Sequence, residues 1–204
     1  TLRYGVGEHE MPLLPYAAML MENAGIMGNP ALEGKDFDQQ IAQLGAAVSY
    51  GCNDSYFYIS ISGEDENMNK IMNLVNRQLL MPYLEQKQLD ALKGNEFFSR
   101  YSRQKRTAVQ KSALMQYALY GKKSAYLDEV KFIDIWNMDG VQVQRLIASA
   151  RTYALDVFYC GTLPEDKLVP ELPLTEGMQP SKSPFVQDRV TYDKPTVLFL
   201  PNSN

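Results

Sequence analysis

Met19, Glu22 and Asn23 have the spacing of a helix face that could carry metal or acid–base chemistry. Positions i, i+3 and i+4 share one side of a helix, so their side chains can converge on one ion. A catalytic zinc ion needs about four nitrogen, sulfur or oxygen ligands, three of them from the protein. The methionine thioether and the asparagine amide are poor ligands, so this stretch predicts no zinc site.

The chain contains one histidine, His9, which lies between Glu8 and Glu10. A histidine beside two acids could bind a metal, but on a loop these residues more often form a solvated turn, which we favour here. The sequence has no GxSxG or CxxC motif and no glycine loop that could cradle a phosphate. The common nucleophile and nucleotide motifs are therefore not found.

A run of basic residues could form a site for an anion or a peptide carboxylate, helped by Tyr101. A charged connection between two helices is the interpretation we favour, because aromatic residues are sparse among them. The run is Arg100, Arg103, Lys105, Arg106 and Lys111. The two cysteines, Cys52 and Cys160, fall in strand-like runs, and we expect both to be buried thiols rather than a disulfide framework.

The composition favours one substantial core. The chain has 204 residues, of which 45% are hydrophobic, and this length suits one domain with a tail. A net charge of -4 argues against nucleic acid or an anionic membrane as the main partner. No apolar run approaches the roughly 20 residues of a membrane span. A start at Thr1 suggests a fragment, so the compartment cannot be read from the ends.

Hydrophobic spacing predicts a strand, two helices and a β-hairpin in the first part of the chain. Residues 2–6 form a short strand, and a helix begins near Pro12 with a buried stripe of Leu14, Ala17, Ala18 and Met21, ending at Gly25. A second helix follows over 37–44 and ends at Gly45. Residues 46–52 and 55–62 form two antiparallel strands joined through Asn53 and Asp54.

Further helices follow the hairpin. Asp65 is the expected N-cap of a helix that stops before Pro82. Helices are also predicted over 85–101 and 109–120, and Asp139 with Gln142 has the spacing of a capping box. A strand over 155–160 completes an α+β fold, an antiparallel sheet covered on one face by several helices.

Proline changes the pattern beyond residue 161. We divide the chain into an α+β domain over 1–161, a Pro-rich linker or strap over 162–193, and a strand over 194–204 that leads into a following domain. The prolines are Pro164, Pro170, Pro173, Pro180 and Pro184.

Residues 1–161 resemble the insulinase and pitrilysin family of zinc metallopeptidases. The resemblance rests on LPYAAMLMENAG and on the helix, hairpin and helix block from Asp36 to Pro82. Active members carry an HxxEH helix, and its histidines fall here on Met19 and Asn23, with the glutamate on Glu22. A later helix of the family supplies a further glutamate, for which Glu96 is the nearest candidate, but we do not transfer that role. Glu22 is interpreted as a solvated glutamate rather than a working remnant.

The family is built from paired halves, often one catalytic and one inert, closing around a peptide chamber. The resemblance therefore implies an inactive lobe that encloses the chamber, positions peptide and supports an active half carrying HxxEH and zinc, either fused or separate. This chain would then bind no cofactor and catalyse nothing by itself. One alternative is a structural or assembly subunit without peptide binding. Another is an enzyme with an unrecognised site, using Cys52 or Glu22.

Overall fold

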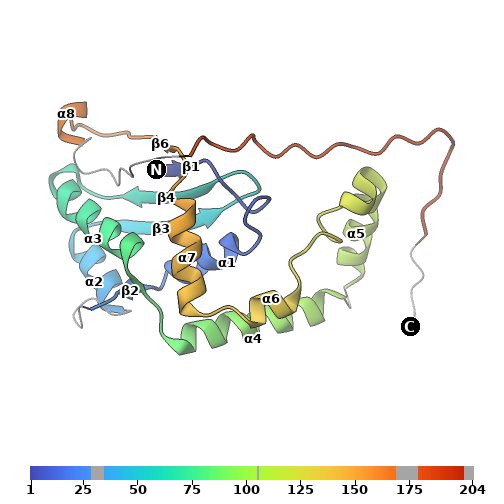
Figure 1. Ribbon diagram of the computed structural model, residues 1–204, viewed down its shortest axis with the longest axis horizontal. Helices are drawn as coiled ribbons and strands as arrows, with labels where there is room; N and C mark the ends of the chain where they lie inside the picture. The colour runs from blue at the N-terminus through green and yellow to red at the C-terminus, as the bar shows by residue number, and fades with distance from the viewer. Residues whose placement is uncertain (29–34, 105, 169–178, 200–204) are drawn as a thin grey trace.

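A four-stranded antiparallel sheet forms the centre of the fold (Figure 1). The computed structural model describes residues 1–28, 35–104, 106–168 and 179–199. Within them the strand order is β3 (Ala47–Cys52), β4 (Phe57–Ser62), β1 (Leu2–Tyr4) and β6 (Leu155–Val157). Leu2 of β1 therefore pairs with Ile59 on one side and with Val157 on the other. The predicted α+β class is confirmed.

The predicted hairpin is present, and its turn is held by Asn53. The side-chain oxygen of Asn53 accepts hydrogen bonds from the backbone N–H groups of Ser55 (3.0 Å) and Tyr56 (2.8 Å). Along β4, Phe57 and Ile59 are buried, whereas Tyr58 is only partly covered on the opposite face. The alternation thus gives the sheet one face in the core and one open face.

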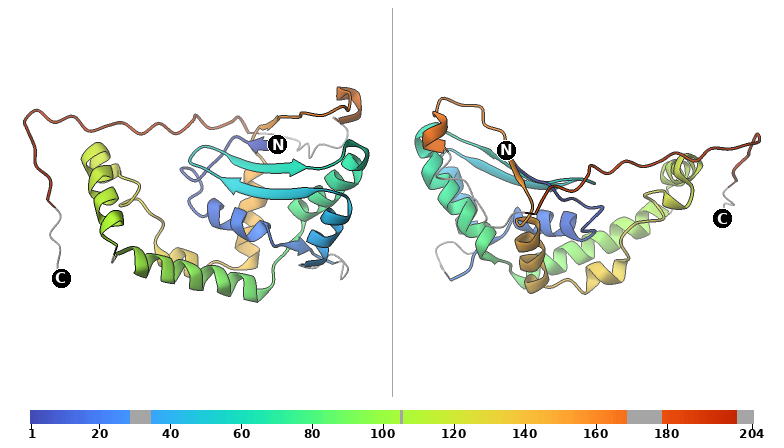
Figure 2. Two further views of the ribbon diagram at one scale, coloured as in Figure 1. Left: turned by 180° about the vertical axis from the view of Figure 1, so that it is seen from behind. Right: turned by 45° about the horizontal axis from the view of Figure 1, so that its top comes forward.

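Three helices pack with the sheet around one core (Figure 2). They are α1 (Leu14–Met21), α3 (Met68–Leu80) and α7 (Gly140–Ala150). The carboxylate of Asp139 accepts a hydrogen bond of 2.7 Å from the N–H of Gln142 and caps α7, as predicted. The core contains Tyr4, Leu14, Met21, Phe57, Ile59, Ile71, Leu79 and Ile147, all no more than 1% exposed.

Another helix adds Phe37 and Ile41 to the core, and a second sheet has two strands. Helix α2 (Lys35–Gln43) ends before Gly45, whose φ of 67° is easily adopted only by glycine. Strand β2 (Gly25–Ile26) pairs with β5 (Pro82–Tyr83) in a separate two-stranded sheet. Gly25 therefore lies in a strand, and the predicted helix end at Gly25 is wrong.

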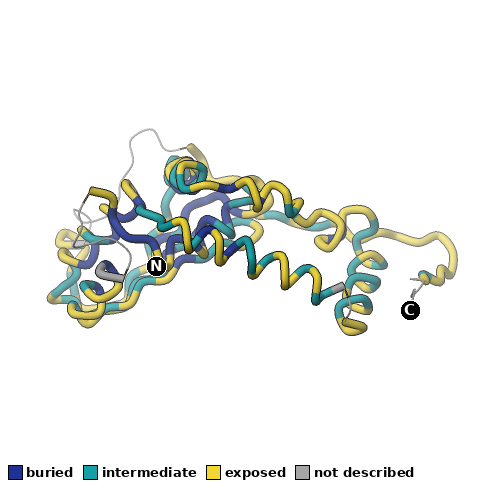
Figure 3. Tube along the Cα trace, turned by 90° about the horizontal axis from the view of Figure 1, so that it is seen from below, coloured by how far each residue is buried: buried dark blue, intermediate teal, exposed yellow. Residues whose placement is uncertain are grey.

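A long helix leads away from this body into an arm, residues 97–136 (Figures 1 and 3). Helix α4 (Gln86–Gln104) buries Leu89 and Leu92 near its start, but α5 (Thr107–Tyr120) has no buried residue. The chain returns through a 3-10 turn, Gly121–Lys123, and α6 (Phe132–Trp136). Four aromatic rings contact one another in sequence along α4 and α6, with centroids 5.7 to 5.8 Å apart: Phe98, Phe97, Phe132 and Trp136.

The described end of the chain, residues 179–199, forms an extended strap (Figure 1). The Lys182 N–H donates to the Gly5 carbonyl (2.8 Å), and the Phe185 N–H donates to the Ser55 hydroxyl (2.8 Å). Farther on, the Val190 N–H donates to the Leu119 carbonyl at the end of α5 (2.8 Å). The strap therefore ties the arm to the body. A short helix, α8 (Glu165–Leu168), precedes the undescribed residues 169–178.

Asp65 does not cap α3, contrary to the sequence prediction. Its carboxylate accepts hydrogen bonds from the N–H and hydroxyl of Thr162 (2.6 Å each) and from the hydroxyl of Tyr159 (2.7 Å), and a 3-10 turn, Asp65–Asn67, precedes α3. These partners follow β6, so Tyr159 leaves the sheet and the strand stops at Val157 instead of Cys160. A tertiary contact has replaced the local cap.

Residues 196–199 form no strand, and Val197 and Phe199 are 93% and 83% exposed, while residues 200–204 lie outside the described chain. In the described part, no helix is long and apolar enough to cross a membrane.

Candidate functional site

Helix α1 carries the three residues singled out from the sequence. Its buried side is the predicted stripe of Leu14, Ala17, Ala18 and Met21, each no more than 1% exposed. Met19, Glu22 and Asn23 lie on the solvent side, and Met19 is 57% exposed. The helix is close to its end here, because the Asn23 N–H bonds to the Leu20 carbonyl (3.3 Å), three residues back. The last turn of the helix, between Met19 and Asn23, is therefore tightened to the 3-10 form.

A buried glutamine fixes the end of α1. Gln78 of α3 is 0% exposed, and its side-chain amide donates to the carbonyl oxygens of Met21 (3.3 Å) and Ala24 (2.5 Å). The same glutamine accepts a hydrogen bond from the Tyr50 hydroxyl of β3. Since carbonyl groups at a helix end have no partner within the helix, Gln78 supplies one and links α1 to α3 and the sheet.

Met19 and Asn23 open onto a pocket of about 570 Å³ between α1, α2 and α4. Buried Leu20 and Leu92 contribute to its wall. Gln88 closes one side, because its amide N–H donates to the Asn23 carbonyl (2.5 Å) and its oxygen accepts from the Glu85 N–H (2.8 Å). The remaining lining residues are Asp38, Glu85, Lys87, Ala91 and Asn95.

The residues at this position do not fit zinc. The described residues contain no group of three or more histidine, cysteine, aspartate or glutamate side chains that could hold a metal ion. The pocket offers a thioether, neutral amides and carboxylates, and carboxylate oxygens alone favour harder cations. Glu22 is exposed and does not line the pocket, in line with its interpretation as a solvated residue.

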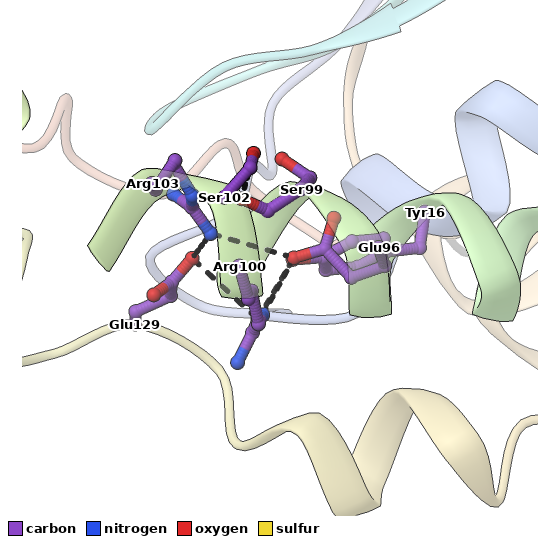
Figure 4. Close-up of polar contacts among 7 residues, drawn as sticks. All are labelled: Tyr16, Glu96, Ser99, Arg100, Ser102, Arg103 and Glu129. Atoms are coloured by element: carbon purple, nitrogen blue, oxygen red, sulfur yellow. Dashed lines mark hydrogen bonds and ion pairs between the residues drawn. The ribbon is translucent and has the colours of Figure 1, made fainter. Parts of the chain in front are cut away.

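Glu96, the candidate for the late acidic ligand, is engaged in an ion-pair network at the base of the arm (Figure 4). Its carboxylate lies 2.6 Å from Nε of Arg100, and both side chains are only 17% exposed. Arg103 lies 2.6 Å from Glu129 on the returning chain and 3.6 Å from Glu96. A carboxylate held this closely by guanidinium groups is not available to a cation.

The basic run therefore divides into two parts. Arg100 and Arg103 join α4 to the segment before α6 through Glu129, which is a structural role. Arg106 and Lys111 are exposed at the start of α5, and Lys105 lies outside the described residues. This division supports the interpretation of the run as a charged connection between helices.

His9 contacts the strap rather than a cluster of ligands. Its ring stacks on Phe185 at a centroid distance of 4.1 Å, beside a pocket of about 600 Å³ between the body and α5. Glu8 also lines that pocket, and burial, reinforced by Asp54 and Glu129, raises the pKa of its carboxyl. No local motif predicts the contact between His9 and Phe185, because the two residues are distant along the chain.

The Cys52 thiol does not suit a nucleophilic role. Burial, with a smaller contribution from nearby Glu8, raises the pKa of the Cys52 thiol to about 12, which keeps it protonated at neutral pH. Cys52 is only half-buried, and Cys160, which lies beyond β6, is exposed, so the expectation that both thiols are buried is wrong. The exposure of Cys160 follows from the early end of the strand at Val157.

The sequence did not reveal the pocket itself. Asp38, Gln88 and Asn95 come from α2 and α4 and have no local motif that links them to Met19. A helix spacing identifies residues on one helix face only, whereas this pocket depends on how three helices pack.

No protein-family model matches this sequence, and no curated protein sequence matches it. Solved peptidases share its fold. The ferredoxin protease FusC, in complex with Arabidopsis ferredoxin, gives a TM-score of 0.77 at 9% identity, over 93% of this chain and 21% of FusC. The periplasmic protease PqqL from Escherichia coli gives 0.68 at 14% identity, over 93% of this chain and 22% of PqqL.

A third similar structure is the peptidase M16 inactive domain from Pseudomonas fluorescens. It gives a TM-score of 0.57 at 15% identity, over 72% of this chain and 36% of that domain's chain. The chain therefore has the fold of an M16 peptidase lobe, as the resemblance to the insulinase and pitrilysin family implied. It spans about a fifth of the length of FusC and PqqL.

Proposed function

We propose that this chain is a non-catalytic lobe of a zinc protease. The observation that carries the proposal is the exposed face of α1, where Met19 and Asn23 border a pocket whose donors do not suit zinc. The fold is that of a peptidase lobe, while the chemistry of a peptidase is missing from this helix. The lobe would contribute shape and contacts to proteolysis performed elsewhere.

The catalytic partner is a homologous half that carries HxxEH and zinc. It is either part of the same polypeptide or a separate subunit. The chain's coverage of about a fifth of FusC and PqqL supports a role as one unit of a larger enclosure. The division into a domain over 1–161, a strap over 162–193 and a segment over 194–204 that leads into a following domain remains a prediction within this proposal, and the described part of that last segment pairs with no other strand.

The peptide role is supported by the place of β3 in the sheet. β3 is an end strand of the described sheet and packs against α1, so its outer edge and the pocket beside α1 lie on neighbouring elements. An extended peptide can add to such an edge through main-chain hydrogen bonds, while pockets receive its side chains. The lobe would thus enclose the chamber and position unfolded substrate.

A second candidate is a structural or assembly subunit that binds no peptide. It is favoured by the exposed rings of Phe97, Phe98 and Trp136, which are 51%, 69% and 52% exposed on the arm. Exposed apolar patches often mark contacts between proteins. Peptide binding separates the two candidates, because only the first requires it.

The test measures three properties of the purified 204-residue chain: zinc content after loading and desalting, cleavage of a fluorogenic peptide library with and without a chelator, and binding of unfolded peptides. We expect substoichiometric zinc, no chelator-sensitive cleavage, and measurable peptide binding. Chelator-sensitive cleavage would refute the non-catalytic role. Absence of peptide binding would favour the assembly subunit.

A further inference from the structure

We infer that the pocket between α1, α2 and α4 is a subsite for a cationic peptide side chain, lysine or arginine. The inference rests on the proposed peptide-positioning function and gives its substrate preference. No sequence motif predicts this pocket. It borders the helix that carries the zinc ligands in the peptidases that the chain resembles, but its residues suit a side chain rather than a metal ion.

The pocket has apolar walls that suit a long aliphatic stem. Met19 of α1 and Ala91 of α4 line it, together with buried Leu20 and Leu92. A volume of about 570 Å³ is ample for one extended side chain. Lysine and arginine commonly bury such stems against apolar surface while their charged ends remain in polar surroundings.

The carboxylate of Asp38, an exposed residue of α2, supplies the complementary charge. Asp38 lines the pocket, and in the described part of the chain it takes part in no ion pair. Partial burial raises the pKa of its carboxyl, and no neighbouring cation opposes that change. Glu85 differs, because it lies 2.5 Å from Lys87 and is already neutralised. The net charge of the pocket at neutral pH is therefore negative.

Neutral amides give the pocket groups for the main chain of a bound peptide. Both ends of the Gln88 side chain are engaged, with Asn23 and Glu85, so this residue holds the walls together. Asn23 and Asn95 also line the pocket, and their side chains can donate to and accept from a peptide group. The pocket thus combines apolar walls, the negative charge of Asp38 and neutral hydrogen-bonding groups.

An anionic ligand suits the same residues poorly. Lys87 is the only cation that lines the pocket among the described residues; it is 70% exposed and paired with Glu85. A negatively charged side chain would face Asp38 and gain no compensating partner. We therefore expect discrimination by charge as well as by length.

The test compares two peptides that differ at one position, acetyl-Ala-Ala-Lys-Ala-Ala-amide and its norleucine counterpart, by calorimetry with the 204-residue chain. Norleucine keeps the stem and removes the charge. Because Asp38 is exposed and an ion pair at an exposed carboxylate contributes about 0.2 to 1 kcal/mol, we expect the lysine peptide to bind about 1.5- to 5-fold more tightly. An arginine and citrulline pair gives the same comparison for the guanidinium group.

The variant Asp38→Asn should remove most of the preference for lysine and leave norleucine binding unchanged. Glu66→Gln, an exposed residue that does not line the pocket, is the matched control for net charge and should retain the preference. Circular dichroism checks that both variants are folded. Equal affinity for lysine and norleucine would overturn the subsite while leaving peptide binding intact.

Two other results would also count against the subsite. If Asp38→Asn weakens both peptides equally, the carboxylate acts on structure and not on the ligand's charge. If neither peptide binds the wild-type chain, both the subsite and the peptide-positioning function fail. Retention of the full lysine preference in Asp38→Asn would place the cation elsewhere.

Discussion

The side-chain amide of Gln78 donates a hydrogen bond to the main-chain carbonyl of Ala24, across 54 residues of sequence. Because Gln78 is fully buried, this bond and the two that it shares with Met21 and Tyr50 satisfy polar groups that water cannot reach. The end of α1 is thereby fixed to α3. This contact sets the position of the helix that borders the candidate pocket.

Replacing Gln78 with leucine should destabilise the protein strongly. Leucine fills a similar volume but leaves buried carbonyl and hydroxyl groups without partners, for an expected loss of about 2 to 4 kcal/mol of unfolding free energy. Urea unfolding followed by circular dichroism measures it. Gln39→Leu, at an exposed position of α2, should change stability by less than about 0.5 kcal/mol. Similar costs for both would show that the buried bonds contribute little.

The ion pair of Glu96 and Arg100 should show measurable coupling in a double-mutant cycle to alanine. Both side chains are largely covered and lie 2.6 Å apart, so we expect a coupling free energy of about 1 to 2 kcal/mol. The exposed pair of Glu85 and Lys87 provides the comparison and should give less than about 0.5 kcal/mol. Equal coupling in the two cycles would contradict the role assigned to burial.

Asp65 should make stability depend on pH in the acid range. Hydrogen bonds from Thr162 and Tyr159 lower the pKa of its carboxyl below the ordinary value. Its contribution is present above the unfolded pKa, near about 3.9, and is lost as the pH falls through the lower folded pKa. The stability difference between wild type and Asp65→Asn should therefore shrink on acidification, as measured by urea unfolding at several pH values.

The neighbouring exposed Glu66, replaced by glutamine, controls for the change in net charge. A difference between wild type and Asp65→Asn that does not vary between about pH 6 and about pH 2 would argue against preferential bonding of the ionised carboxylate.

Two glycines should respond to alanine in opposite directions. Gly45 follows α2 with a φ of 67°, where a Cβ atom is unfavourable, so Gly45→Ala should cost about 1 kcal/mol. Gly94 lies within α4 with open space around its Cα, so Gly94→Ala should stabilise the protein by about 0.5 to 1 kcal/mol. Thermal and urea unfolding of the two variants provide the check, and a shared sign would refute the assignment of either backbone conformation.

Sequence patterns predicted the elements that depend on local periodicity. The stripe of α1, the hairpin turn at Asn53 and the cap at Asp139 are all present, because each involves residues close together in sequence. The fold class followed from the order of those elements. The position of the α1 stripe also located the solvent face on which Met19 and Asn23 lie.

Contacts between distant residues could not be predicted in this way. Asp65 is a residue type that often caps helices, but Thr162 and Tyr159, which follow β6, donate three hydrogen bonds to its carboxylate. The partners of Gln78 and the pocket around Asp38 depend on the packing of helices that no periodicity relates. Glu96 was considered as a metal ligand because its ion pairs with Arg100 and Arg103, which also pair with Glu129 of the returning chain, could not be placed beforehand.

The row of rings along α4 and α6 has a practical meaning for every solution measurement. Phe97, Phe98 and Trp136 keep half or more of their surface in water, on a part of the molecule that projects from the body. Such a surface favours self-association as protein concentration rises. We therefore expect binding isotherms and unfolding midpoints of this chain to depend on protein concentration. Values extrapolated to infinite dilution describe a single molecule.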